Sequence, residues 1–154
     1  MEPVTIKPHH FMDIIKLYGG GLERFVPDPA MGHDFYRIGN LVLENPELPL
    51  RLTTEGDDIC KPCKYYAGRC SDLISHIPGI MEKDSYNKLL DSRILKLFHL
   101  AGPGYTPRTL CQALYRQRSL IFDVWKEENR EAAEKRYALF SAGAERYLKE
   151  RCQE

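Results

Sequence analysis

The chain has 154 residues, and its 22 basic and 22 acidic side chains give a formal net charge of zero. This length suits one domain with its own hydrophobic core, and 43% hydrophobic against 29% charged residues is typical of a globular chain rather than a disordered one. The balanced charge argues against a role in binding nucleic acid or a membrane surface through bulk electrostatics. No apolar run follows a basic segment among the first residues, and no apolar stretch approaches the roughly 20 residues of a membrane helix. We therefore expect a cytoplasmic protein.

Two helices are predicted in the first third of the chain. Residues Pro8–Tyr18 combine a proline at the first helical position with apolar residues at helical spacing, and Gly19-Gly20-Gly21 ends the pattern. A second helix is expected from about Met31 to Glu44, where Asn45-Pro46 interrupts it.

One strand is predicted, and it leads toward a cysteine. Leu48–Thr54 alternates apolar and polar residues, as a half-buried strand does. Glu55–Asp58 then forms a turn, in which Asp57 and Asp58 are expected to accept backbone N–H groups. A rigid strand followed by a tight turn fixes where the next loop begins, so this segment favours a metal-binding knuckle starting at Cys60.

The second half of the chain is predicted to be helical. One helix is expected over Asp84–Leu100, and another begins at Pro107, with Thr106 as its N-cap. The stretch Leu120–Cys152 has apolar residues spaced along one face of a long helix, and the polar run Glu127–Glu131 predicts either a bend or an exposed middle within it.

These elements predict an α+β fold that is predominantly helical, with a short strand leading into a cysteine knuckle and a long C-terminal helix. We expect a metal-knuckle domain over residues 1–118 and a C-terminal helical extension over residues 119–154. The extension packs either on the same domain or on a partner, which includes a second copy in a homodimer; the pattern does not decide between them.

Cysteine usage is the strongest functional signal. The chain has five cysteines, an odd number, and Cys60, Cys63 and Cys70 fall within one short segment. A secreted disulfide scaffold more often has an even number spread along the chain, so clustered thiols favour a reducing compartment and metal binding. Three thiolates this close repel one another unless a cation is present. The alternative is that the three cysteines are reduced thiols that bind no metal.

The identity of the metal is left open by the cysteines alone. Thiolate-rich sites suit both zinc and iron–sulfur clusters. Structural zinc usually takes four protein ligands, whereas Cys111 and Cys152 stand alone in predicted helices. A [4Fe–4S] cluster can be held by three cysteines and a different fourth ligand. An iron–sulfur cluster is therefore the leading prediction, with zinc as the alternative.

Additional ligands are expected from the first helix. His9 and Asp13 are four residues apart and share a helix face, and His10 lies beside them. A neutral imidazole or a carboxylate from this group could complete a site of three cysteines and a fourth ligand. Alternatively, one histidine caps the start of the helix and the other hydrogen-bonds a backbone carbonyl.

Two motifs together resemble a known family. They are Ile6–Phe11, with its paired histidines, and the run from Asp57 through Asp-Ile-Cys-Lys-Pro-Cys to Cys70. Through these motifs the chain resembles a family of small bacterial and archaeal proteins of unknown function, regarded as iron–sulfur binding. The resemblance covers about the first two-thirds of the chain. The resemblance implies that the three clustered cysteines are ligands. This chain departs from the family pattern at one position, because Asp13 stands where the family often has a cysteine.

Three functions remain as hypotheses. The first is an iron–sulfur protein with a redox or electron-transfer role and an unidentified redox partner. The second is a zinc-stabilised domain that binds another protein. The third is a metalloenzyme with an open coordination position beside Asp13 and His9 or His10. No catalytic residue is predicted from the sequence.

Overall fold

The computed structural model describes residues 2–27, 32, 34–62, 83–100 and 104–152. Two of the predicted ligands, Cys63 and Cys70, lie outside these described residues. The elements are β1 (Val4–Ile6), α1 (Pro8–Gly19), α2 (Phe35–Glu44), β2 (Leu50–Leu52), α3 (Lys83–Leu97), α4 (Pro107–Arg116), a 3₁₀ turn (Arg118–Leu120), α5 (Ile121–Val124), α6 (Arg130–Arg146) and a π turn (Tyr147–Arg151). The expected fold class, α+β and predominantly helical, is confirmed.

A two-stranded parallel sheet joins the start of the chain to the segment before the cysteines. In its register Val4 pairs with Leu50 and Ile6 with Leu52. The pairing continues past the strands, because the Thr53 N–H donates to the Ile6 carbonyl at 3.2 Å and the Asp58 N–H donates to the Thr5 carbonyl at 3.0 Å. The chain after β2 is thereby held against the entrance to α1.

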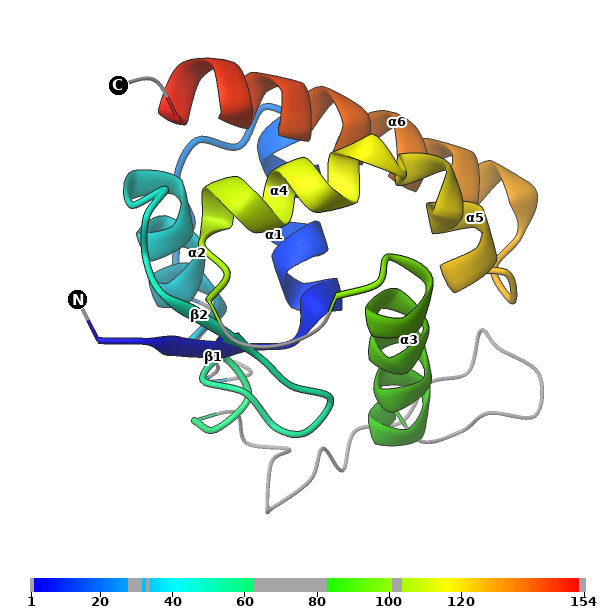
Figure 1. Cartoon of the computed structure of the whole chain (residues 1–154), viewed down its shortest axis with the longest axis horizontal. Coiled ribbons are helices and arrows are strands. Elements are labelled where there is room, and N and C mark those ends of the chain that lie inside the picture. Colours follow the sequence, from blue (N-terminus) through cyan, green and yellow to red (C-terminus); the bar gives the residue numbers. More distant parts are fainter. Residues whose placement is uncertain (1, 28–31, 33, 63–82, 101–103, 153–154) are drawn as a thin grey trace.

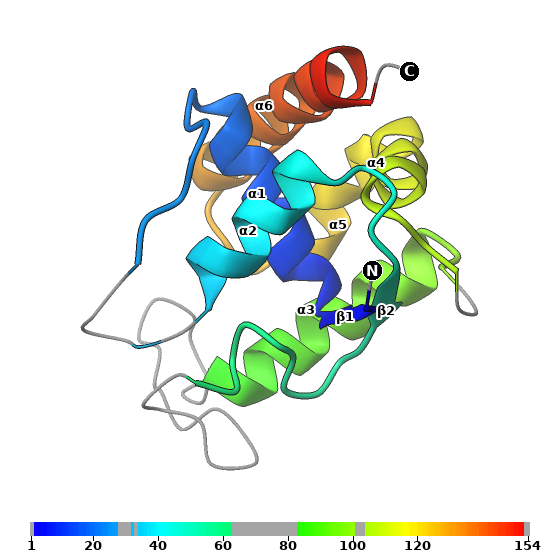
Figure 2. The same cartoon turned by 90° about the vertical axis from the view of Figure 1, so that its left-hand side faces the viewer.

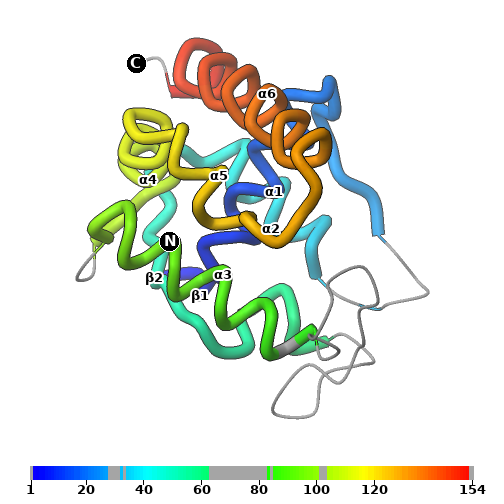
Figure 3. Tube along the Cα trace, turned by 90° about the vertical axis from the view of Figure 1, so that its right-hand side faces the viewer, coloured from blue at the N-terminus to red at the C-terminus, as the bar shows by residue number. Residues whose placement is uncertain are grey.

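Helix α1 is the centre of the molecule. It lies between α6 on one side and the sheet with α3 on the other, and the three views agree on this arrangement (Figures 1, 2 and 3). The apolar positions that predict this helix form its buried face, with Phe11, Ile14, Ile15 and Tyr18 all inaccessible to solvent. Because α1 is covered on several sides, polar groups on its first turn must find partners within the protein.

The C-terminal segment differs from the single helix expected over Leu120–Cys152. The chain leaves α5 after Val124 and starts α6 at Arg130, with the Asn129 side chain capping the new helix by accepting the Ala132 N–H at 2.7 Å. The bend expected at the polar run is therefore confirmed, and it is a complete break. Helix α6 packs on α1, and the Tyr147 hydroxyl donates to the Val42 carbonyl at 2.6 Å, deep in the core.

Other boundaries shift by a few residues. Helix α2 begins at Phe35 rather than near Met31, and β2 covers only Leu50–Leu52. Strand β1 was missed because three residues carry too little periodicity to be recognised. None of the helices among the described residues has the length and apolar character that crossing a membrane requires.

The contact between α1 and α6 gives the first testable prediction. A Cβ placed on Gly143 would overlap the Ile15 carbonyl and crowd the backbone of Gly19, because the two helix backbones touch there. Gly143→Ala is expected to lower the free energy of unfolding by about 3 kcal/mol or more. Gly20→Ala is the control, since its Cβ meets nothing closer than 3.4 Å. Urea denaturation of both variants checks this, and equal stabilities would contradict the close packing.

Candidate metal centre

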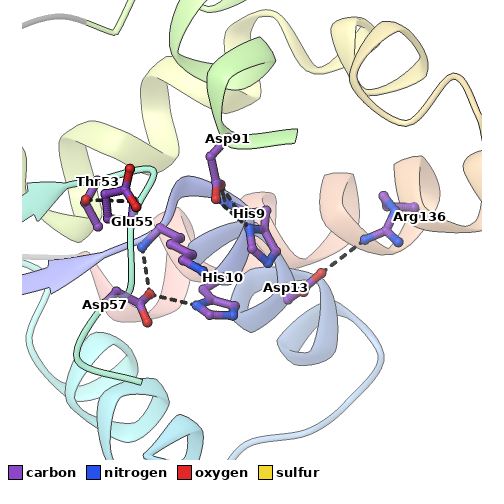
Figure 4. A network of polar contacts seen from close by, with 9 residues as sticks. His9, His10, Asp13, Thr53, Glu55, Asp57, Asp91 and Arg136 are labelled. Carbon is purple, nitrogen blue, oxygen red and sulfur yellow. Dashed lines mark hydrogen bonds and ion pairs between the residues drawn. The ribbon is translucent and has the colours of Figure 1, made fainter. Parts of the chain in front are cut away.

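Asp57 is the residue that assembles the candidate site. Its carboxylate is fully buried and accepts the Lys7 backbone N–H at 2.8 Å and the Cys60 backbone N–H at 3.0 Å. The same carboxylate lies 2.7 Å from Nδ1 of His10 (Figure 4). One side chain thus ties the turn after β2 to the first turn of α1. The expected role of Asp57 and Asp58 in shaping this turn is confirmed, because Asp58 also accepts the Thr5 N–H at 2.9 Å.

The local electrostatics fix which form of the Asp57–His10 pair is present. Burial alone would raise the pKa of Asp57, but His10 and the backbone donor at Lys7 lower it well below its usual range. Burial lowers the pKa of His10, and the neighbouring His9 lowers it further. At pH 7 these shifts favour a carboxylate and a neutral imidazole that donates from Nδ1. In this tautomer the lone pair is on Nε2, and carboxylates orient histidines in the same way in known metal sites.

Cys60 lies beside this oriented histidine. The potential ligand atoms of His10, Asp57 and Cys60 are all within 4.8 Å of one another. Because the Asp57 oxygens already accept three donors, we interpret Asp57 as the group that orients His10, with His10 and Cys60 as ligands. Burial, with the Asp57 charge, raises the pKa of the Cys60 thiol to about 12. A metal would have to displace that proton on binding.

The buried Lys7 side chain places a positive charge close to Cys60. The Lys7 residue is only 1% exposed, and among the described residues its side chain has no hydrogen-bond or ion-pair partner. It is close enough to Cys60 to lower the pKa of that thiol. A buried cation is costly without a counter-charge. A metal bound by several thiolates carries net negative charge, so the residues present fit such a group.

His9 is held by a different partner, on α3. Its Nδ1 lies 2.9 Å and 3.0 Å from the two carboxylate oxygens of Asp91 on α3, and its backbone N–H donates to the same residue at 2.9 Å. Burial opposes a charge on His9, but Asp91 outweighs burial and raises the pKa of the imidazole. The rings of His9 and His10 are 4.3 Å apart, yet they reach toward different carboxylates (Figure 4).

Asp13 faces α6. Its carboxylate pairs with Arg136 at 3.1 Å and with Lys16 at 3.7 Å. Of the residues expected to act as ligands, the described structure therefore brings together His10 and Cys60. His9 is engaged by Asp91 and Asp13 by Arg136, while Cys63 and Cys70 lie outside the described residues. Sequence reasoning missed Asp91 and Lys7, because nothing near either residue marks a partner distant in the chain.

The Asp57 carboxylate predicts a specific pH dependence. A depressed pKa in the folded state means that Asp57 contributes stability above pH 3.8, its ordinary value, and that this contribution is lost as the pH falls below it. Asp57→Asn is expected to cost about 3 kcal/mol at pH 7 in the metal-free protein and progressively less toward pH 3. Urea denaturation across this range checks the prediction. Asp123→Asn, at an exposed position on α5, is the control. A cost of Asp57→Asn that does not change with pH would contradict the prediction.

Comparison of this chain with protein-family models, curated proteins and solved structures finds no match.

Proposed function

We propose that this protein binds a metal through His10, Cys60, Cys63 and Cys70, with an iron–sulfur cluster as the cofactor and a redox or electron-transfer role. The observation that carries the proposal is the imidazole of His10, held by Asp57 through Nδ1, with a ring nitrogen within 4.8 Å of the sulfur of Cys60, the first cysteine of the Cys60-x-x-Cys63 motif. Among the described residues no hydrogen bond engages the other ring nitrogen, Nε2. The same arrangement supports His10 rather than Asp13 as the fourth ligand, because the Asp13 carboxylate is engaged by Arg136.

The chemistry of the donor set supports a thiolate-bound cluster. Three thiolates and one imidazole are soft to borderline ligands, which iron–sulfur clusters accept. When bound, such a cluster supplies one-electron transfer to and from a redox partner. Lys7 would offset part of its negative charge from within the protein. Reduced thiols are required throughout, so we propose a cytoplasmic location.

A specific observation also favours zinc as a second candidate. The main argument against structural zinc is the lack of a fourth protein ligand, and His10 supplies one. Three cysteines and one histidine form a closed tetrahedral set that is common in structural zinc sites. In that case the metal stabilises the fold, and the protein acts by binding another protein.

Anaerobic purification followed by metal analysis, absorption spectroscopy and EPR tests the proposal. We expect iron and inorganic sulfide in the protein, visible absorption from sulfur-to-iron charge transfer, and an EPR signal in one oxidation state. Stoichiometric zinc in a colourless protein would overturn the cluster and support the second candidate. A protein that takes up neither metal after anaerobic reconstitution would overturn both.

A further inference from the structure

A second polar site lies on the other side of His9 from the candidate metal centre. A cavity of about 190 Å³, open to solvent, lies between α1, α3 and α6, and its lining includes His9, Asp13, Lys83, Asn87, Leu90, Trp125, Glu128 and Arg136. Figure 4 shows Asp13 reaching across to Arg136 on the side of His9 away from Asp57. Cavities near 150 Å³ in other proteins accommodate benzene, so this one has room for a molecule of about six non-hydrogen atoms.

Two buried side chains at the cavity have polar atoms that make no hydrogen bond with any described residue. His9 and Asn87 are each only 6% exposed. His9 uses Nδ1 for Asp91, and within the described part of the chain neither its Nε2 nor the Asn87 amide makes a hydrogen bond. Buried polar groups are usually satisfied, because leaving them unpaired costs free energy. Both groups line the same cavity, so one molecule inside it could satisfy them together.

The charged groups around the cavity are already engaged. The Arg136 guanidinium pairs with Asp13 at 3.1 Å and with Glu128 at 3.1 Å, and it stacks over the Trp125 ring at 4.3 Å. His9 has Asp91 behind it, and Lys83, the other charged residue of the lining, has an interaction of its own. A charged molecule would therefore have to compete with these existing interactions. This favours a neutral ligand that recognises its site by hydrogen bonds.

We propose that this cavity binds a small neutral amide, a molecule with one carboxamide group and a short apolar part. The Asn87 carboxamide presents a donor and an acceptor side by side, which a second carboxamide complements with an acceptor and a donor. His9 Nε2 provides a further hydrogen-bonding atom. The Trp125 ring and Leu90 provide the apolar wall against which the carbon end packs. This site is separate from the metal ligands and does not depend on the identity of the metal.

Three small probes of different charge test the proposal, and the first two have nearly the same size and shape. They are acetamide, acetate and ethylammonium, titrated into the full-length protein. Trp125 is the only tryptophan in the chain and lines the cavity, so its fluorescence reports binding there. We expect a saturable change with acetamide, with a dissociation constant on the order of millimolar for so small a ligand. We expect no saturable change with acetate or ethylammonium.

Two matched variants test whether acetamide binds in this cavity. Asn87→Leu keeps the size of the side chain and removes the amide, and it is expected to weaken acetamide binding at least tenfold while the metal content stays unchanged. Gln112→Leu removes an exposed amide on α4 and is expected to bind like the wild type. Saturable binding of acetate or ethylammonium, equal binding by Asn87→Leu, or a linear response to all three probes would overturn the proposal. The last result would mean that the cavity holds only water.

Discussion

Replacing Cys60 with serine is expected to lower the affinity of the protein for its metal by at least about 100-fold. The reason is the loss of one thiolate from a four-ligand site whose total binding free energy is on the order of 10–16 kcal/mol in structural zinc sites. His10→Ala is expected to act in the same way. Competition with a chromophoric chelator measures the affinity for zinc, and iron content after anaerobic reconstitution measures retention of a cluster.

Two further variants separate the loss of a metal ligand from a general effect of substitution. Asp57→Asn keeps every proposed ligand and disturbs only the orientation of His10, so we expect a loss of about 10–100-fold. Cys111→Ala removes a fully buried thiol on α4, outside the proposed ligand set, and is expected to leave metal affinity unchanged. A metal that binds Cys60→Ser as tightly as the wild type would contradict the assignment, as would equal losses in Cys60→Ser and Cys111→Ala.

The second large effect is expected at Asp91, which is fully buried and accepts both the Nδ1–H and the backbone N–H of His9. Asp91→Ala is expected to lower the free energy of unfolding by about 3–5 kcal/mol, because a buried charged group then loses its partner. Glu134→Ala breaks only an exposed pair with Arg130 and should cost no more than about 0.5 kcal/mol.

The charges of the His9–Asp91 pair contribute to the free energy of unfolding in a way that depends on pH. Because the pKa of His9 is raised in the folded protein, the contribution is present in full below pH 6.5 and is lost as the pH rises through the folded pKa. The cost of Asp91→Ala should therefore be greatest near pH 6 and smaller at pH 9. Chemical denaturation at the two pH values measures this difference, and a cost that rises with pH would contradict the assigned pairing.

Local signals in the sequence predicted the helical part of the fold well. Pro8 and the apolar spacing after it define α1, and Thr106 caps α4 by accepting the Thr109 N–H at 3.2 Å. The polar run after Trp125 marks the break before α6. These features could be predicted because caps, prolines and periodic apolar faces act over only a few residues.

The site depends on contacts that no local pattern encodes. The His9–Asp91 pair joins residues 82 positions apart, and the His10–Asp57 pair spans 47. The cysteine motif predicted a metal, and the paired histidines predicted that α1 would contribute to its site. Which histidine faces Cys60 depends on the parallel pairing of β1 with β2, which places the turn after β2 beside the first turn of α1. That pairing could not be predicted, because β1 was not recognised as a strand.

We infer that His10 and three cysteines form a single metal site, and X-ray absorption at the metal edge of the zinc-loaded protein tests this most directly. We expect three sulfur neighbours at about 2.3 Å and one nitrogen neighbour at about 2.0 Å around the zinc. In His10→Ala the nitrogen should disappear while the sulfur neighbours remain. A coordination sphere made only of oxygen and nitrogen, or one unchanged by His10→Ala, would contradict this ligand set.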